Sequence, residues 1–205
     1  MNNYYVDIDQ QVVDDCIADY YSNKTFRSRE MAKADPKVHI DYFTNLAVKT
    51  LEEKVSFVSG NYYKHSLPYL PHTDYKKHLD NKLNMVIPLE ITGEEASLLI
   101  FDQMWLEDSV TWDMGFDRIV ELKTNTYTKG SPIEYDITNK TGKPFDIDTH
   151  SKYVKYYKIE DLYGLTCSAY DFVPGKAMLF DNRRLHCTSH FQGKKLGLSL
   201  RFKYG

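Results

Sequence analysis

The hydrophobic pattern of the chain changes near residue 55. Before it, apolar residues recur every three or four positions, at Val12, Val13, Cys16, Ile17 and Tyr20 and again at Ile40, Phe43, Leu46, Ala47 and Leu51. This spacing places one apolar stripe along an α-helix. The pattern therefore predicts helices over 8–22 and 38–55, and Asp35-Pro36 supplies a start signal for the second.

After residue 55 the apolar runs become short and rich in β-branched or aromatic residues, with Gly, Pro and charged residues between them. Such runs are typical of strands. They predict strands at 55–58, 82–89, 96–101, 165–173, 177–180 and 196–204. Helices followed by strands indicate an α+β protein, with a helical part of about 1–54 packed on an all-β core of about 55–205. One domain, 1–205, is expected for this length.

Residues 123–150 do not fit this pattern, because they are rich in Thr, Asn, Asp and Lys and contain little that could fill a core. We interpret them as a long excursion from the β core. A lid over a site, a hairpin and a plain surface loop all remain open for this segment.

Composition narrows the functional classes. The net charge of −3 argues against nucleic acid as a partner, and basic pairs such as Lys194-Lys195 are expected to be solvated surface. No apolar run reaches the length of a membrane span, and the first ten residues lack the features of a signal peptide. Cys16, Cys167 and Cys187 are expected to be reduced thiols, so we predict a cytoplasmic protein.

The candidate chemistry begins at His72-Thr73-Asp74. Residues i and i+2 of a strand point to the same side, so His72 and Asp74 can reach one metal ion. A later His on a neighbouring strand would complete a set of two histidines and one carboxylate, which holds Fe(II) on one face and leaves positions open. A lone His-x-Asp occurs often by chance, so the third ligand carries weight.

His186 is the preferred third ligand. It follows a Pro174-Gly175 turn, an apolar strand and a polar bend at 182–184. His190, four residues later, is the alternative.

Two segments resemble the Fe(II)/2-oxoglutarate-dependent dioxygenase superfamily. They are FDNRRLHC at 180–187 and Asn61-Tyr62-Tyr63 ahead of His72-Thr73-Asp74, and the similarity extends over about 55–204. The order of turn, strand and bend before His186 is the usual setting of the distal ligand in this superfamily, so the resemblance implies His72, Asp74 and His186 as the metal ligands. The resemblance further implies a double-stranded β-helix, the jelly-roll or cupin-like fold. It also implies Fe(II) and 2-oxoglutarate as cofactors, oxygen as cosubstrate, and most commonly hydroxylation with release of succinate and CO2.

In that superfamily an Arg or Lys on the last core strand binds the far carboxylate of 2-oxoglutarate. Here Gly197, Ser199 and Arg201 share one face of the alternating segment 196–202, so Arg201 is the predicted partner and Lys203 the reserve. Tyr63 would add its hydroxyl to the same carboxylate.

The substrate is expected to be a small molecule or amino-acid-like compound. Candidate lining residues are Tyr62, Tyr69, Gln103, Trp105 and Trp112. Arg183 and Arg184 could engage an anionic substrate or only cap the bend. Two other readings stay open, a cupin-like metal enzyme that does not use 2-oxoglutarate and a non-catalytic jelly-roll binding module. The sequence predicts neither the substrate's identity nor the oligomeric state.

Overall fold

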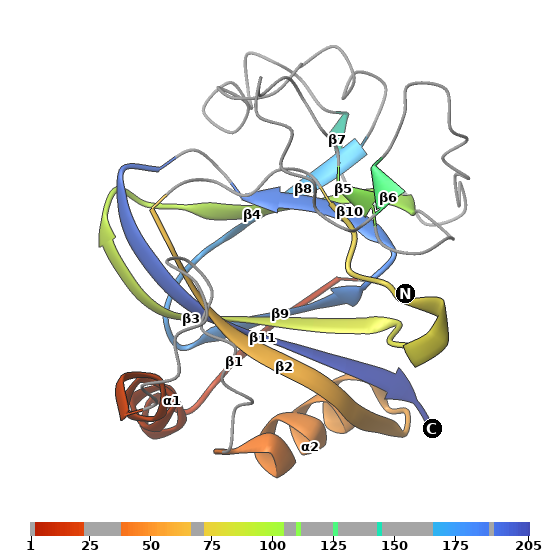
Figure 1. Ribbon diagram of the computed structural model, residues 1–205, viewed down its shortest axis with the longest axis horizontal. Helices are drawn as coiled ribbons and strands as arrows, with labels where there is room; N and C mark the ends of the chain where they lie inside the picture. Colours follow the sequence, from red (N-terminus) through yellow and green to blue (C-terminus); the bar gives the residue numbers. More distant parts are fainter. Residues whose placement is uncertain are drawn as a thin grey trace.

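The computed structural model of the protein describes residues 3–22, 38–66, 72–104, 110–111, 125–126, 143–144, 166–188 and 191–205. Two antiparallel sheets face each other (Figure 1). The larger has the order β1-β9-β3-β11-β2, formed by Tyr4–Asp7, Lys176–Asp181, Leu83–Gly93, Gly193–Tyr204 and Val55–His65 respectively. Strand β11 lies between β3 and β2 and is paired with them along nearly its whole length.

The second sheet has the order β10-β4-β8-β7, formed by Arg184–Thr188, Ser97–Met104, Thr166–Asp171 and Lys143–Pro144. A short parallel pair, β5 (Val110–Thr111) and β6 (Asn125–Thr126), is separate from both. The chain moves repeatedly between the two sheets: β8 lies in the second, β9 in the first, β10 in the second and β11 in the first. The predicted β-rich core is therefore present, as a two-sheet sandwich.

The space between the sheets is filled by apolar side chains from both. Val86 of β3 and Phe180 of β9 meet Leu98 and Ile100 of β4 in one buried cluster. Alternate residues of these strands point into this layer because side chains alternate across a strand. Phe180 also meets β10, because its ring centre lies 4.8 Å from that of His186.

Helices α1 (Gln10–Ser22) and α2 (Ile40–Leu51) lie against the outer face of the larger sheet (Figure 1). Val13 and Phe43 belong to one buried cluster with Met85 and Leu198 of that sheet. A short 3-10 helix, η1, spans Lys77–Leu79. None of the helices among the described residues is long and apolar enough to cross a membrane.

The structure corrects the sequence prediction at several elements, of which two come first along the chain. Residues Tyr4–Asp7 form an edge strand that pairs with β9 inside a region predicted as helical, and the two tyrosines and Val6 suit a strand. Strand β2 continues to His65 instead of ending near residue 58, because β11 pairs with it throughout. Most of the polar segment 123–150, including its predicted role, lies outside the described residues.

Candidate active site

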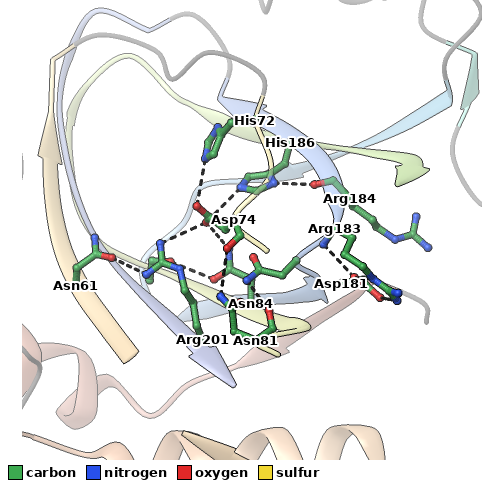
Figure 2. A network of polar contacts seen from close by, with 12 residues as sticks. Asn61, His72, Asp74, Asn81, Asn84, Asp181, Arg183, Arg184, His186 and Arg201 are labelled. Atoms are coloured by element: carbon green, nitrogen blue, oxygen red, sulfur yellow. Dashed lines mark hydrogen bonds and ion pairs between the residues drawn. The ribbon is translucent and has the colours of Figure 1, made fainter. Parts of the chain in front are cut away.

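The interior between the sheets holds the three predicted ligands together (Figure 2). The ligand atoms of His72, Asp74 and His186 all lie within 4.8 Å of one another. Nε2 of His72 is 4.0 Å from Oδ1 of Asp74, and Nε2 of His186 is 3.7 Å from Oδ2. The side chains of His72 and Asp74 are 18% and 21% exposed while that of His186 is 4% exposed, so solvent reaches the group from the His72 and Asp74 side.

Backbone pairing explains why residues so far apart in sequence meet. His72 and His186 form an antiparallel bridge in which each backbone N–H donates to the other residue's carbonyl, both at 2.9 Å. Directly opposed residues project to the same side, and the two imidazole centres are 4.2 Å apart. Asp74, two residues beyond His72, points to the same side as the histidines.

The orientation of His186 is fixed by its second ring nitrogen. Nδ1 lies 3.0 Å from the carbonyl oxygen of Arg184, which can only accept, so Nδ1 carries the proton. The lone pair is then on Nε2, which faces Asp74. The ring of Phe180 packs edge-on at 4.8 Å and restricts rotation of the imidazole. A histidine held this way presents a ready ligand atom.

Asp74 is held through both its backbone and its carboxylate. Its N–H donates to the carbonyl of Asn182 at 3.1 Å, and Nδ2 of Asn81 donates to its carbonyl at 3.2 Å. Nδ2 of Asn84 donates to Oδ2 at 3.1 Å, and the Arg201 guanidinium lies 3.4 Å from the same oxygen.

The charge state of Asp74 follows from these neighbours. Burial on its own raises the pKa of this carboxyl, but Arg201, the His186 contact and the His72 ring outweigh it and hold the pKa well below its usual range. Asp74 is therefore a carboxylate at neutral pH. Two imidazoles and one carboxylate converging from one side form the donor set that suits Fe(II) with open coordination positions.

A second polar feature lies further along the inner face of β11. Lys195 is fully buried, and its Nζ has no hydrogen-bond partner among the described residues. Nζ sits over the rings of Phe172 and Phe191, at 4.8 and 4.6 Å from their centres. Burial lowers the pKa of Lys195 to about 7, against a smaller raising effect of Cys187. A buried ammonium without a charged partner is costly, and it is a ready site for an anion.

Tyr63 and His65 of β2 lie beside this lysine. His65 is the cross-strand neighbour of Lys195, and its ring stacks on that of Tyr63 at 5.2 Å. Burial, together with the nearby charges of Lys195 and His72, lowers the pKa of His65 to about 3. His65 therefore lies, as a neutral ring, within electrostatic reach of both groups.

Gly197 explains how Tyr63 fits into the interior. A Cβ at Gly197 would lie 2.4 Å from both Cζ and the hydroxyl oxygen of Tyr63, closer than any real contact. The small residue on β11 therefore makes room for the Tyr63 hydroxyl. The second small residue, Ser199, donates through Oγ to Oδ1 of Asn84 at 3.1 Å.

Arg201 lies beside the metal ligands. Its Nη2 is 3.4 Å from Oδ2 of Asp74, and its Nη1 donates to Oδ1 of Asn61 at 2.8 Å (Figure 2). Lys203, the predicted reserve, is exposed at the end of β11. The structure thus brings Arg201 close to the predicted metal ligands and leaves Lys203 at the surface.

Other predicted residues lie elsewhere. Tyr62 is fully buried on the opposite face of β2, where its hydroxyl donates to Asp19 of α1, so it does not line the site. Arg184 forms a buried ion pair with Asp102 at 3.1 Å, and Arg183 pairs with Asp181 at 2.6 Å. Tyr69, Trp105, Trp112 and His190 lie outside the described residues, as does the side chain of Gln103.

Sequence reasoning missed three groups near the site. Lys195 was expected to be surface, whereas it is buried and only its neighbour Lys194 is exposed. The signal was present: Lys195 is two residues before Gly197, on the face already assigned to the interior. Asn84 and His65 carry no motif, and only strand pairing places them here.

Comparisons with known proteins bear on the fold. The chain matches no protein-family model and no curated protein sequence. Among solved structures it resembles the non-haem alpha-ketoglutarate-dependent carbocyclase SnoK from nogalamycin biosynthesis, with a TM-score of 0.56 and 11% identity over 98% of this chain and 78% of SnoK.

Two other similar structures contain bound groups. The epimerase SnoN in complex with Fe3+, alpha ketoglutarate and nogalamycin RO gives a TM-score of 0.53 at 11% identity, covering 98% of this chain and 78% of SnoN. Iron-bound HygX from Streptomyces hygroscopicus gives 0.51 at 9% identity, covering 98% and 81%. The protein therefore has the fold of the Fe(II)/2-oxoglutarate-dependent oxygenase superfamily.

Proposed function

We propose that the protein is an Fe(II)- and 2-oxoglutarate-dependent oxygenase that hydroxylates a small-molecule or amino-acid-like substrate. The observation that carries this proposal is one interior with two features, the ligand group of His72, Asp74 and His186 and the buried unpaired cation of Lys195. The first suits Fe(II), and the second suits the far carboxylate of a dianion bound to the metal.

The protein's contribution is to hold its groups in place before any ligand arrives. The Arg184 carbonyl sets the His186 tautomer, and Asn84 holds one oxygen of Asp74. Bound iron and 2-oxoglutarate would supply oxidative decarboxylation to succinate and CO2, coupled to oxygenation of the substrate. The interior around His186 and Phe180 is buried, which keeps bulk water from that side of the metal.

Lys195 and Tyr63 are the favoured partners of the far carboxylate of 2-oxoglutarate. Lys195 has no hydrogen-bond partner among the described residues, and Tyr63 stacks on its neighbour His65. Arg201, predicted from the sequence, remains the second candidate. It is less suited because its guanidinium is engaged by Asp74 and Asn61. Lys195 and Arg201 are six residues apart on β11, which corresponds to roughly 20 Å of extended chain. The two side chains are therefore not expected to bind the same carboxylate.

The proposal extends to partners and location. A net charge of −3 favours a small-molecule substrate over nucleic acid. Cys16, Cys167 and Cys187 are free buried thiols, which suits the reducing cytoplasm.

Anaerobic titration with Fe(II), with and without 2-oxoglutarate, tests the function. We expect a visible charge-transfer band that needs both components, and succinate release once oxygen and substrate are added. Metal binding that is indifferent to 2-oxoglutarate would instead support a cupin-like metal enzyme. Absence of metal binding would support a jelly-roll binding module and overturn the proposal.

A further inference from the structure

The metal ligands are open to solvent on one side, and Arg201 lies on that side. The side chain of Arg201 is 20% exposed, similar to Asp74 at 21% and His72 at 18%, whereas that of His186 is 4% exposed. Because Arg201 contacts the partly exposed Asp74, a substrate that reaches Asp74 from solvent comes close to the Arg201 guanidinium. The guanidinium has five N–H donors in a planar fork. Among the described residues, Asn61 contacts its Nη1 and Asp74 lies near its Nη2.

The charges around the site do not balance once the cofactors are bound. A divalent ion and the dianion 2-oxoglutarate offset each other. Asp74 then compensates one of the two cations on the inner face of β11, Arg201 and Lys195. Arg183 and Arg184 do not change this result, because each is paired with its own aspartate.

His65 adds no charge, since it is neutral at physiological pH. The described residues therefore leave one positive charge in excess. Lys195 is fully buried and suited to 2-oxoglutarate, so the excess lies on the exposed side, at Arg201.

We infer that the substrate carries a carboxylate or a comparable monoanionic group, and that Arg201, with Asn61 beside it, binds this group at the open side of the metal site. This assignment rests on the proposed function, because it takes Lys195 as the partner of 2-oxoglutarate. When Asp74 ligates a metal ion, its attraction for Arg201 weakens, and the guanidinium becomes available to a second anion. Asn61 holds Nη1 at 2.8 Å and so keeps the fork in place when that happens.

Arg201 could either orient Asp74 or bind the substrate anion, and the two roles have different consequences. A residue that only orients Asp74 would affect metal affinity and would be indifferent to the charge of the substrate. A residue that binds the substrate anion would set a preference for a carboxylate over its uncharged amide. The test must therefore measure charge preference and metal affinity on the same protein.

The experiment uses full-length protein loaded with Co(II), whose visible absorption reports the metal environment, saturated with 2-oxoglutarate under argon. Propionate and propionamide are titrated as probes of nearly equal shape, by calorimetry and by the change in the Co(II) bands. We expect propionate to bind at least tenfold more tightly than propionamide, because a charge-assisted bidentate contact is worth about that much. Arg201→Gln should remove the preference. Arg183→Gln is the matched control and should retain it, because Arg183 pairs with Asp181 away from the ligand group.

Three outcomes would overturn the inference. Equal affinity for the two probes in the wild-type protein would show that no anion is selected. A preference for propionate that survives in Arg201→Gln would mean that another group binds the anion. A loss of Co(II) affinity alone in Arg201→Gln would mean that Arg201 only positions Asp74. Failure of 2-oxoglutarate to bind the wild-type Co(II) protein at all is a distinct result, because it would remove the proposed function and this inference with it.

Discussion

The two cations on the inner face of β11 are in opposite situations. Arg201 contacts Asp74 and Asn61 and keeps a fifth of its side chain exposed. Lys195, six residues earlier, is fully buried over two phenylalanine rings, with no hydrogen-bond partner among the described residues. The region around Arg201 is electrostatically satisfied without a ligand, whereas the region around Lys195 is not.

The difference indicates which of the two cations needs a bound anion to balance its charge. A paired cation such as Arg201 stabilises the protein that surrounds it, so its presence alone says little about ligands. A buried, unpaired ammonium destabilises the empty protein by several kcal/mol before relaxation, unless an anion enters. This contrast supports the proposal that the cosubstrate anion binds at Lys195, and that Arg201 serves Asp74 and the substrate.

The largest expected effect concerns the metal end of the interior. His186→Ala or Asp74→Ala should reduce Fe(II) affinity by more than about 100-fold, because even residues that merely support a metal ligand are worth 10–100-fold. The fold should persist, since these side chains lie beside the core clusters and not within them. Anaerobic Fe(II) titration and circular dichroism measure the two quantities.

His190→Ala is the control for this prediction and should retain metal. If His190→Ala loses metal while His186→Ala keeps it, the ligand assignment is shifted by four residues. The metal would then lie at a different position relative to Arg201 and Lys195, and the contrast between these two cations would have to be revised.

The next effect separates the two cations directly. Lys195→Met should weaken 2-oxoglutarate binding roughly 100-fold, which corresponds to about 3 kcal/mol for a buried anion that loses its charged partner. Fe(II) affinity should be unchanged, because the Nζ of Lys195 makes no hydrogen bond to His72, Asp74 or His186. Arg201→Met should instead reduce the Fe(II) affinity, because Arg201 contacts Asp74, and should change the 2-oxoglutarate affinity less than Lys195→Met does. A larger loss of 2-oxoglutarate binding in Arg201→Met than in Lys195→Met would restore the sequence-based assignment.

A third effect appears in the stability of the protein without ligands. The pKa of Lys195 is about 7 in the folded protein, against an ordinary 10.5, so between these values the unfolded chain binds the extra proton. Stability then rises with pH from about 7 toward about 10.5, by up to about 1.4 kcal/mol per pH unit. Below pH 7 both states are protonated and this contribution is constant.

Lys195→Met should abolish this rise and stabilise the ligand-free protein near neutral pH. Urea denaturation at pH 7 and pH 9 measures both changes. A wild-type protein whose stability does not increase over this range would show that Lys195 stays charged when buried, and the contrast with Arg201 would be weaker than the structure indicates.

The sequence singled out the three residues that the structure brings together as candidate metal ligands, whereas Lys195 was missed although the strand alternation held its signal. His72, Asp74 and His186 lie in short motifs whose geometry follows from strand alternation and one backbone bridge. The burial of Lys195 depends on how far β11 extends: the strand was predicted from residue 196, whereas it begins at Gly193. With that start, the alternation through Gly197 and Ser199 places Lys195 in the interior.

The fold shows the same division between local and non-local information. The buried positions of α1, such as Val13 and Cys16, are the ones whose periodicity indicated a helix. Strand β1 was missed because four residues are too few to show a period, and its pairing partner β9 is more than 160 residues away. Asn84 reaches Asp74 only through the registry of β3 and β11, which no local pattern contains.

The smallest expected effect tests two adjacent tyrosines on opposite faces of β2. Tyr63 points into the interior against Gly197, whereas Tyr62 points to the helices and donates to Asp19 at 2.8 Å. Tyr63→Phe should weaken 2-oxoglutarate binding about tenfold, the worth of one hydrogen bond to a charged group, and leave unfolding nearly unchanged. Tyr62→Phe should leave 2-oxoglutarate binding unchanged and lower the free energy of unfolding by about 1 kcal/mol, because the part-buried hydrogen bond from the Tyr62 hydroxyl to Asp19 is lost. Calorimetric 2-oxoglutarate titration and urea denaturation of both variants measure this exchange of effects. Equal 2-oxoglutarate affinity in Tyr63→Phe and wild type would confine the anion site to Lys195. The Lys195 end of β11 would then bind its anion with a single charge, whereas the Arg201 end has a network of polar contacts.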